Sequence, residues 1–170
     1  LYIWVPSNVT KHLGGSEQVR VTFDLMRQKC RERGLKGLYF VGCCGGADKA
    51  SLERMKAEGW DATSAYGNGW RPPADSVHAG DLTYAPAEEF TNQQEAIWKG
   101  KQEIGALPDI TAAMMGWDAR PWKSSNFYWA DNTAAKFRDL CLRAKAVMDS
   151  PGNGPDRTHV IFCCWNEFGE

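Results

Sequence analysis

Residues 37–44 read GLYFVGCC, an apolar run without the polar alternation of a half-buried strand. Such a run is typical of a strand that a parallel sheet buries on both faces. A helix is predicted just before it, opening after Gly14 and Gly15 and ending at Gly34. The apolar residues of this helix recur at steps of four, three and four: Val19, Phe23, Met26 and Cys30. The first part of the chain therefore predicts a helix that leads into a buried parallel strand.

The same alternation continues on both sides of this strand. Four further strands are predicted at 1–5, 60–66, 109–114 and 159–165. Further helices are predicted at 49–57, 92–104 and 131–148, the last with Ala134, Phe137, Cys141, Ala144 and Met148 on one face. Residues 67–86 are expected to form a Gly/Pro-rich loop, and 119–131 an irregular segment. Alternating strands and helices at this spacing predict a parallel α/β fold.

Two parallel architectures fit this pattern, a doubly wound sheet and a (β/α)8 TIM-type barrel. No GxGxxG motif follows a strand, as many doubly wound nucleotide-binding sheets would require. Polar and aromatic residues instead follow three predicted strands, at 66–70, 117–122 and 165–170. Barrel enzymes build their active sites from the loops at that end of the strands. We therefore expect residues 1–170 to form the second half of a (β/α)8 barrel domain, about five β/α units, truncated at both ends.

Composition excludes several classes of protein. The 170 residues are 43% hydrophobic, enough for a buried core, and the formal net charge is −1. This mixed charge gives no electrostatic case for nucleic acid or an anionic membrane surface. No apolar run approaches the roughly 20 residues that span a bilayer. Composition assigns no cellular compartment.

Cysteine and histidine patterns predict neither a metal nor another cofactor. The six cysteines contain no CxxC spacing, and the three histidines are scattered without a partner pattern. Four of the cysteines are adjacent pairs inside apolar runs, so we expect buried thiols that act as small hydrophobic residues. No metal ligands are assigned.

The strongest candidate for chemistry is a pair of glutamates, Glu167 and Glu170, directly after the last predicted strand. Hydrolysis of a glycosidic bond requires one group that protonates the leaving oxygen and a second that acts as base or nucleophile. Two nearby carboxylates also raise each other's proton affinity, which favours one protonated member. The alternative is a helix N-terminus whose dipole favours acidic residues. Trp165 and Asn166 beside the pair favour a sugar site, because an amide can orient a carboxylate or a hydroxyl.

Two more segments are candidates for substrate binding. In GWDARPW, residues 116–122, Arg120 either holds a sugar hydroxyl or forms a structural ion pair with Asp118. In SAYGNGW, residues 64–70, Tyr66 projects from a strand end and two glycines allow close approach of a ligand, although they equally suit a turn. The aromatic residues of these two segments are suited to stacking on sugar rings: Tyr66, Trp70, Trp117 and Trp122.

These motifs together resemble one family of carbohydrate-active enzymes. GWDARPW, the terminal WNEFGE and YGNGW are similar to the glycoside hydrolase family 99-like barrels, which include WbsX-like proteins of polysaccharide metabolism. The resemblance runs from about Val5 to Glu170 and implies a (β/α)8 fold with retaining, endo-α-mannosidase-like cleavage. It implies that Glu167 assists attack by the sugar's 2-hydroxyl and that Glu170 is the general acid and then the base. Phe168 and Gly169 depart from the family's Trp and His, which weakens the α-mannosidase assignment more than the carbohydrate one.

Two other functions remain open. One is a glycosyltransferase or polysaccharide-biosynthesis protein, for which LGGSEQ, residues 13–18, offers a helix N-terminus to a phosphate. The motif lacks the lysine and the spacing of a P-loop. The other is a barrel that binds glycans without cutting them. In each case the expected partner is an oligosaccharide or polysaccharide.

Overall fold

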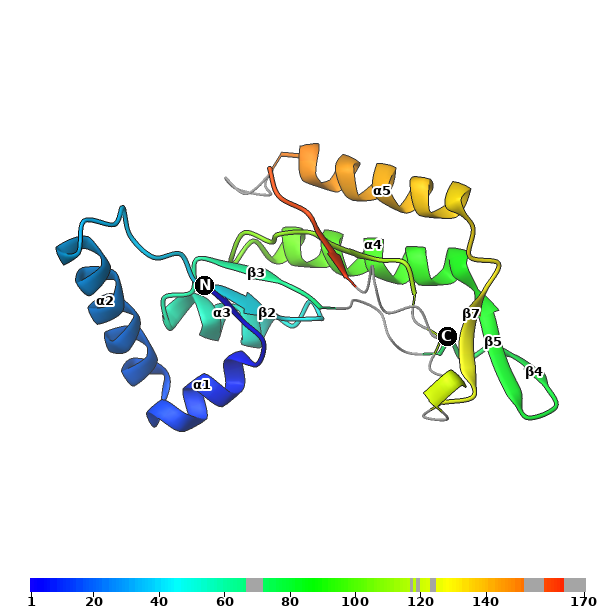
Figure 1. Cartoon of the computed structure of the whole chain (residues 1–170), viewed down its shortest axis with the longest axis horizontal. Coiled ribbons are helices and arrows are strands. Elements are labelled where there is room, and N and C mark those ends of the chain that lie inside the picture. The colour runs from blue at the N-terminus through cyan, green and yellow to red at the C-terminus, as the bar shows by residue number, and fades with distance from the viewer. Residues whose placement is uncertain (67–71, 117, 119, 123–124, 152–157, 164–170) are drawn as a thin grey trace.

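The computed structural model describes residues 1–66, 72–116, 118, 120–122, 125–151 and 158–163 (Figure 1). In this part of the chain it has five α-helices and eight short β-strands. The helices are α1 (Pro6–Leu13), α2 (Ser16–Glu32), α3 (Lys49–Ala57), α4 (Ala87–Ile104) and α5 (Ala134–Asp149). The α/β class predicted from the sequence is confirmed.

The principal strands lie side by side in the order in which they occur in the chain. Strands β1 (Tyr2–Ile3), β2 (Val41–Cys43) and β3 (Ala62–Ser64) pair in parallel. Strand β6 (Ala112–Met114) pairs in parallel with β8 (Ile161–Cys163). A parallel bridge between Thr63 and Asp109 joins the two groups, as does the hydrogen bond from the Ile110 amide to the Thr63 carbonyl, 2.8 Å. This isolated bridge aligns two separate sheets, β1-β2-β3 and β6-β8, in the order β1-β2-β3-β6-β8.

All five helices pack on one face of this sheet. Gly42, Thr63 and Asp109 pair across the strands, and Ala113 lies four residues beyond Asp109, so the four share a face. An ideal Cβ at Gly42 would lie 2.3 Å from the Met55 Cε of α3 and 3.0 Å from the Pro6 Cγ of α1, so only glycine admits these helices. Further along the face, Ala113 packs against residues of α4 and α5: Trp98, Leu140, Ala144 and Val147.

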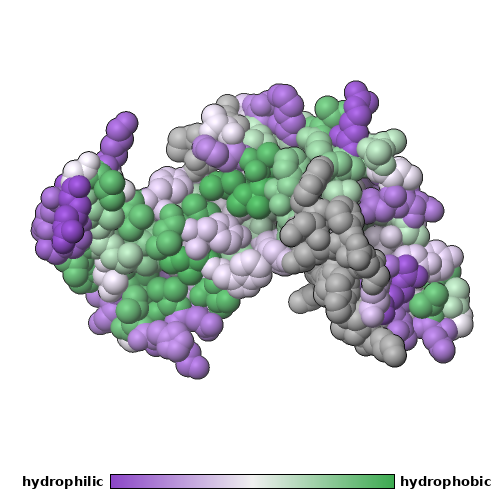
Figure 2. Space-filling view, viewed as in Figure 1, coloured by the Kyte–Doolittle hydropathy of each residue, from purple (hydrophilic) through white to green (hydrophobic). Residues whose placement is uncertain are grey.

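One core cluster explains why α2 packs on this face of the sheet. Its buried members are Val19, Phe23, Phe40, Met55 and Trp60. Phe23 of α2 stacks on Phe40, with ring centroids 3.8 Å apart, and meets the Trp60 ring edge-on. Of the predicted stripe, Val19 and Phe23 are buried, whereas Met26 is exposed and Cys30 is only partly buried. In the space-filling view, hydrophobic residues gather over the middle of the molecule and hydrophilic residues at its periphery (Figure 2). The prediction of the helix stripe is therefore confirmed for its first two members only.

A second, smaller sheet lies in two segments that were predicted to be irregular. Strands β4 (Val77–Ala79) and β5 (Leu82–Pro86) form an antiparallel hairpin, and β5 pairs in parallel with β7 (Phe127–Ala130). The predictions of a Gly/Pro-rich loop at 67–86 and an irregular segment at 119–131 were therefore wrong at 77–79, 82–86 and 127–130. The pairing is non-local, supported by Tyr84 and Tyr128 on neighbouring strands with ring centroids 5.5 Å apart.

Helix boundaries differ from prediction in three places. Helix α1 was missed, although Pro6 suits a first helical turn and Gly14 ends the helix with left-handed φ of 87°. Helix α4 begins at Ala87, five positions before the predicted start, while α3 spans the predicted 49–57. Helix α5 buries Ala144 of the predicted stripe together with Leu140 and Val147, whereas the stripe's Phe137, Cys141 and Met148 are only partly buried and Ala134 is exposed.

The cysteines also differ from expectation. Cys30, Cys43, Cys44 and Cys141 are free thiols, but each is only partly buried. Cys163, the buried one at the end of β8, is disulfide-bonded. The prediction of buried, unpaired thiols is therefore wrong for Cys163.

The buried Glu58 carboxylate links helices α1, α2 and α3. The Glu58 side chain is fully buried, and its Oε1 accepts hydrogen bonds from Thr10 Oγ1 at 2.9 Å and Ser16 Oγ at 2.8 Å. Arg54 pairs with the same oxygen at 2.7 Å, and the Trp60 indole donates to Oε2 at 2.9 Å. Desolvation raises the pKa of Glu58, but these hydrogen bonds outweigh it and hold the pKa below its ordinary value.

This shift predicts how stability depends on pH. Because the folded pKa of Glu58 is lowered, its contribution is fully present above the unfolded pKa of about 4.3 and is lost as pH falls through the folded pKa. We expect Glu58→Gln to lower the free energy of unfolding at pH 7 and to flatten its fall between pH 5 and pH 3, measured by urea denaturation. Glu53→Gln, at an exposed position of α3, is the control. Parallel pH profiles for wild type and Glu58→Gln would contradict the prediction.

Candidate functional site

The candidate site lies at the carboxyl edge of the parallel sheet. Parallel strands end at the same edge, so the described residues that directly follow β1, β3 and β6 lie there. The segments after β3 and β6 supply the accessory β4-β5-β7 sheet. Figure 1 shows this sheet at the end of the molecule toward which β8 runs. Residues far apart in sequence are therefore gathered at one edge.

The structure describes some of the predicted site residues. Tyr66 follows β3, and Asp118 and Arg120 follow β6. Trp122 is described only through its backbone, at the end of the 3-10 turn Arg120–Trp122. The remaining predicted site residues lie outside the described part of the chain: Trp70, Trp117, Trp165, Asn166, Glu167 and Glu170. Their assignments stay predictions.

Asp118 and Arg120 form an ion pair, which is the structural alternative that the sequence left open. Arg120 Nε lies 2.8 Å from Asp118 Oδ1 and 2.9 Å from Oδ2, and the Arg120 amide donates to Oδ1 at 3.0 Å. The hydrogen bond from the Arg120 side chain is the main reason that the pKa of Asp118 is lowered. Asp118 is thus a carboxylate at neutral pH and positions Arg120 rather than donating a proton.

Arg120 keeps part of its hydrogen-bonding capacity. Its guanidinium lies 3.7 Å from the centroid of the Tyr128 ring on β7, a cation–π contact that fixes its plane. Over a third of each side chain of the Asp118–Arg120 pair remains exposed. A guanidinium has five N–H donors, and the Asp118 carboxylate does not occupy all of them. Arg120 is therefore oriented for contact with a polar ligand at the carboxyl edge.

Tyr66 is not isolated at the end of β3. Its ring lies 4.3 Å from the Trp4 ring, which follows β1, and its amide donates to the Cys43 thiol at 3.3 Å. Trp4 was missed because it falls inside the apolar run predicted as a strand. The strand ends at Ile3, so Trp4 belongs to the carboxyl edge. A predicted strand that ended at Ile3, before the bulky Trp4 side chain, would have assigned Trp4 to the carboxyl edge.

Tyr2 lies on β1, two residues before Trp4, and is 39% exposed. Partial desolvation raises the pKa of Tyr2 above its ordinary value, and the neighbouring Cys43 thiol adds to the shift. Tyr2 on β1 is therefore protonated throughout the physiological range. It supplies a hydrogen-bonding hydroxyl near the strand ends rather than a base.

The described residues present no metal centre. They contain no group of three His, Cys, Asp or Glu side chains that could hold an ion. Two of the histidines have hydroxyl neighbours instead: His78 Nδ1 lies 3.1 Å from Thr83 Oγ1, and His159 Nδ1 lies 2.9 Å from Thr158 Oγ1.

The helix start in LGGSEQ does not suit a phosphate. Ser16 begins α2, and its hydroxyl donates to the buried Glu58 carboxylate at 2.8 Å. This negative charge already occupies the region beside the helix N-terminus, and it would repel a second anion. The contact therefore argues against the phosphate alternative.

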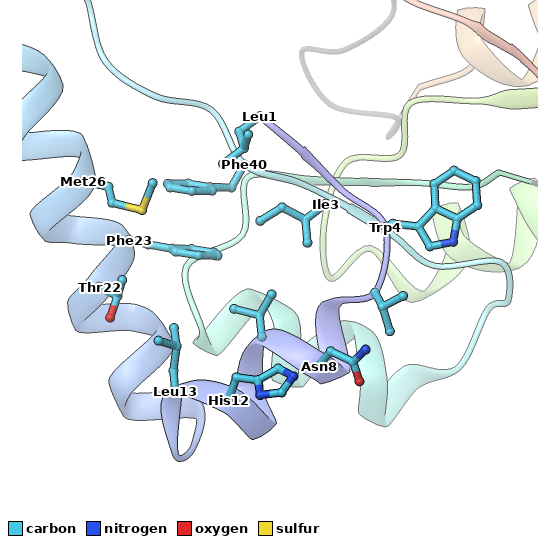
Figure 3. A pocket seen from close by; sticks show the side chains of 12 residues that line it. Leu1, Ile3, Trp4, Asn8, His12, Leu13, Thr22, Phe23, Met26 and Phe40 are labelled. Atoms are coloured by element: carbon cyan, nitrogen blue, oxygen red, sulfur yellow. The ribbon is translucent and has the colours of Figure 1, made fainter.

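A groove of about 500 Å³ lies beside β1, between α1 and α2, and Trp4 is one of the residues that line it (Figure 3). Its walls are mainly apolar, among them Leu1, Ile3, Leu13, Phe23 and Met26. Sugar sites need several convergent polar groups to fix hydroxyls, which this groove offers only through Asn8, His12 and Thr22. We do not assign it to the site.

Comparisons with known proteins find no similar protein. The chain matches no family model, no curated protein and no solved structure. Within the described residues, no helix combines the length and the apolar character needed to cross a bilayer. Functional inference therefore depends on the residues and their geometry.

Proposed function

We propose that this protein is a glycoside hydrolase-like enzyme of the (β/α)8 type that cleaves α-linked glycans with Glu167 and Glu170. One observation carries the proposal: the parallel strands follow chain order, and every helix packs on one face. A doubly wound sheet reverses its strand order at a switch point and carries helices on both faces. A barrel has consecutive strands and an outer ring of helices, with the active site at the carboxyl edge.

The groups at this edge support a carbohydrate substrate. Tyr66 and Trp4 supply aromatic surface, and Arg120 is held in place by Asp118 and Tyr128. Sugar sites combine apolar stacking surfaces with a few fixed hydrogen-bond donors. Glu167 and Glu170 follow β8, the next strand of the order, so the proposal places their segment beside these groups.

The proposed reaction divides the work between the two glutamates. Glu170 transfers its proton to the glycosidic oxygen as the bond between that oxygen and the anomeric carbon breaks, and Glu167 accepts the proton of the 2-hydroxyl as the 2-oxygen bonds to the anomeric carbon. Water then attacks the anomeric carbon of the anhydrosugar and gives a proton to Glu170, while Glu167 returns its proton to the 2-oxygen as the bond from that oxygen to the anomeric carbon breaks. These roles come from the resemblance of WNEFGE to family 99-like enzymes. Attack by the sugar's own hydroxyl followed by water inverts twice, so the product retains its α configuration.

A substrate screen tests the proposal. We expect the protein to release reducing sugar from at least one member of a panel of α-linked oligosaccharides, with α-mannosides first. Proton NMR of the fresh product is expected to show the α anomer. Saturable binding without turnover would identify a glycan-binding protein instead. Chain elongation that requires a nucleotide sugar would identify a transferase, and either result would overturn the proposal.

A further inference from the structure

We propose that Trp4 and Tyr66 together form a sugar-stacking subsite, in which Trp4 holds one pyranose ring of the glycan. The inference rests on the proposed function and extends it to a residue outside the motifs that suggested that function. It assigns the carboxyl end of β1 to substrate binding, in addition to the ends of β3, β6 and β8.

The two rings meet across the end of the strand between them. Trp4 follows β1 and Tyr66 follows β3, while β2 lies between these strands. Their ring centroids are nevertheless only 4.3 Å apart, with a tilt of 47° between the planes. Both side chains therefore lean over the end of β2. The tilt gives the pair the shape of a shallow V rather than a flat plate.

The pair lies on the sheet face opposite the helices. Side chains alternate along a strand, and Ile3 contacts the helix-side core. Trp4, one residue later, points to the other face, as does Tyr66, which lies three residues beyond the helix-side Thr63. Trp4 is one of the residues that line the groove beside β1, but in Figure 3 its ring points away from Phe23 and Met26 of α2. The rings thus belong to the face that a barrel turns toward its axis.

Nothing bulky from β2 covers the rings. The chain leaves β2 through Cys44, Gly45 and Gly46, and an ideal Cβ at Gly46 would meet no atom within 4 Å. Trp4 is 55% exposed and Tyr66 36% exposed. By contrast, Trp60 and Trp98 are almost fully buried, and their indole N–H groups donate to Glu58 and to the Ala112 carbonyl. Among the described residues, no hydrogen-bond acceptor is assigned to the Trp4 indole N–H.

This combination fits a pyranose better than a purely apolar ligand. A pyranose presents C–H groups on its faces and hydroxyls around its rim. An exposed indole offers a π face for the first and an N–H donor for the second. A purely apolar ligand would leave the N–H without an acceptor, at a cost in binding free energy. The observations therefore favour a sugar ring as the occupant.

Calorimetric titration with α-linked mannotetraose tests the subsite, using the Glu167→Gln/Glu170→Gln protein so that the ligand is not cut. We expect Trp4→Ala in this background to weaken binding about tenfold, as truncation of a central aromatic contact does. Trp4→Phe should retain most of the affinity. The matched control is Tyr39→Ala. Tyr39 is an aromatic residue that is 40% exposed, between the exposures of Trp4 and Tyr66, but it precedes β2 at the opposite edge of the sheet. Unchanged affinity in Trp4→Ala would overturn the subsite and leave the proposed function standing.

A second measurement does not depend on the folding of a truncated variant. With 5-fluorotryptophan incorporated, the fluorine resonance that disappears in Trp4→Phe reports on Trp4 alone. We expect mannotetraose to shift this resonance. If mannotetraose binds and the resonance does not move, Trp4 is not at the subsite. If neither mannotetraose nor any glycan of the panel binds the parent protein, both the subsite and the proposed function fail.

Discussion

Glu170→Gln is expected to lower kcat on the best α-linked substrate by about 10²–10⁴, the usual contribution of a well-placed proton donor. An amide has nearly the shape of the carboxylic acid but cannot transfer a proton to the leaving oxygen. KM should change much less, since ground-state contacts with the sugar are retained. Steady-state kinetics with circular dichroism as a folding check would measure both effects.

The leaving group separates the roles of the two glutamates. The phenolate of an aryl glycoside with an acidic phenol leaves with little need of protonation, so Glu170→Gln should lose much less kcat/KM on it, because this ratio reports the first step and not the later one in which Glu170 is the base. Glu167→Gln should be impaired on both substrates, because formation of the anhydrosugar still requires a base. Glu103→Gln, at an exposed position of α4, is the control and should keep full activity. Full activity of either Glu167→Gln or Glu170→Gln on the natural linkage would refute the assigned roles.

The sequence predicted well those features that depend on local periodicity. The apolar run GLYFVGCC contains the strand Val41–Cys43, and the helix stripe is buried at Val19 and Phe23. The helix predicted at about 49–57 is confirmed, and Asp48 fixes its start by accepting a hydrogen bond from the Ser51 amide. In each case, neighbouring residues determine the structure.

The sequence failed where the decisive partner is distant in the chain. Strand β7 forms because Phe127–Ala130 meets β5 more than 40 residues away. Phe127, Tyr128 and Trp129 favour a strand, but the turn-forming residues around both strands hid this signal, and local sequence cannot specify the distant partner. The contact between Trp4 and Tyr66 is of the same kind, since it requires β1 and β3 to be placed on either side of β2.

Lys101→Met is expected to destabilise the fold by about 3–5 kcal/mol, because it removes one partner from a buried ion pair. Lys101 Nζ lies 2.8 Å from Asp109 Oδ1, and the two side chains are only 1% and 5% exposed. In the variant, Asp109 would keep one hydrogen bond, from Thr63 Oγ1 at 2.7 Å, with no cation to balance its charge. Urea denaturation monitored by tryptophan fluorescence would measure the loss.

The position of this pair explains why the effect should be large. Thr63 and Asp109 form the bridge that joins β1-β2-β3 to β6-β8, and Lys101 reaches them from α4. Lys99→Met, two residues away, removes an ion pair with Glu95 whose lysine is 56% exposed, so it should cost less than about 1 kcal/mol. Replacing both charged partners, as Lys101→Met/Asp109→Leu, should recover part of the loss, because no unpaired charge is then buried. If Lys101→Met cost no more than Lys99→Met, this buried charge pair would not be what holds the two groups of strands together.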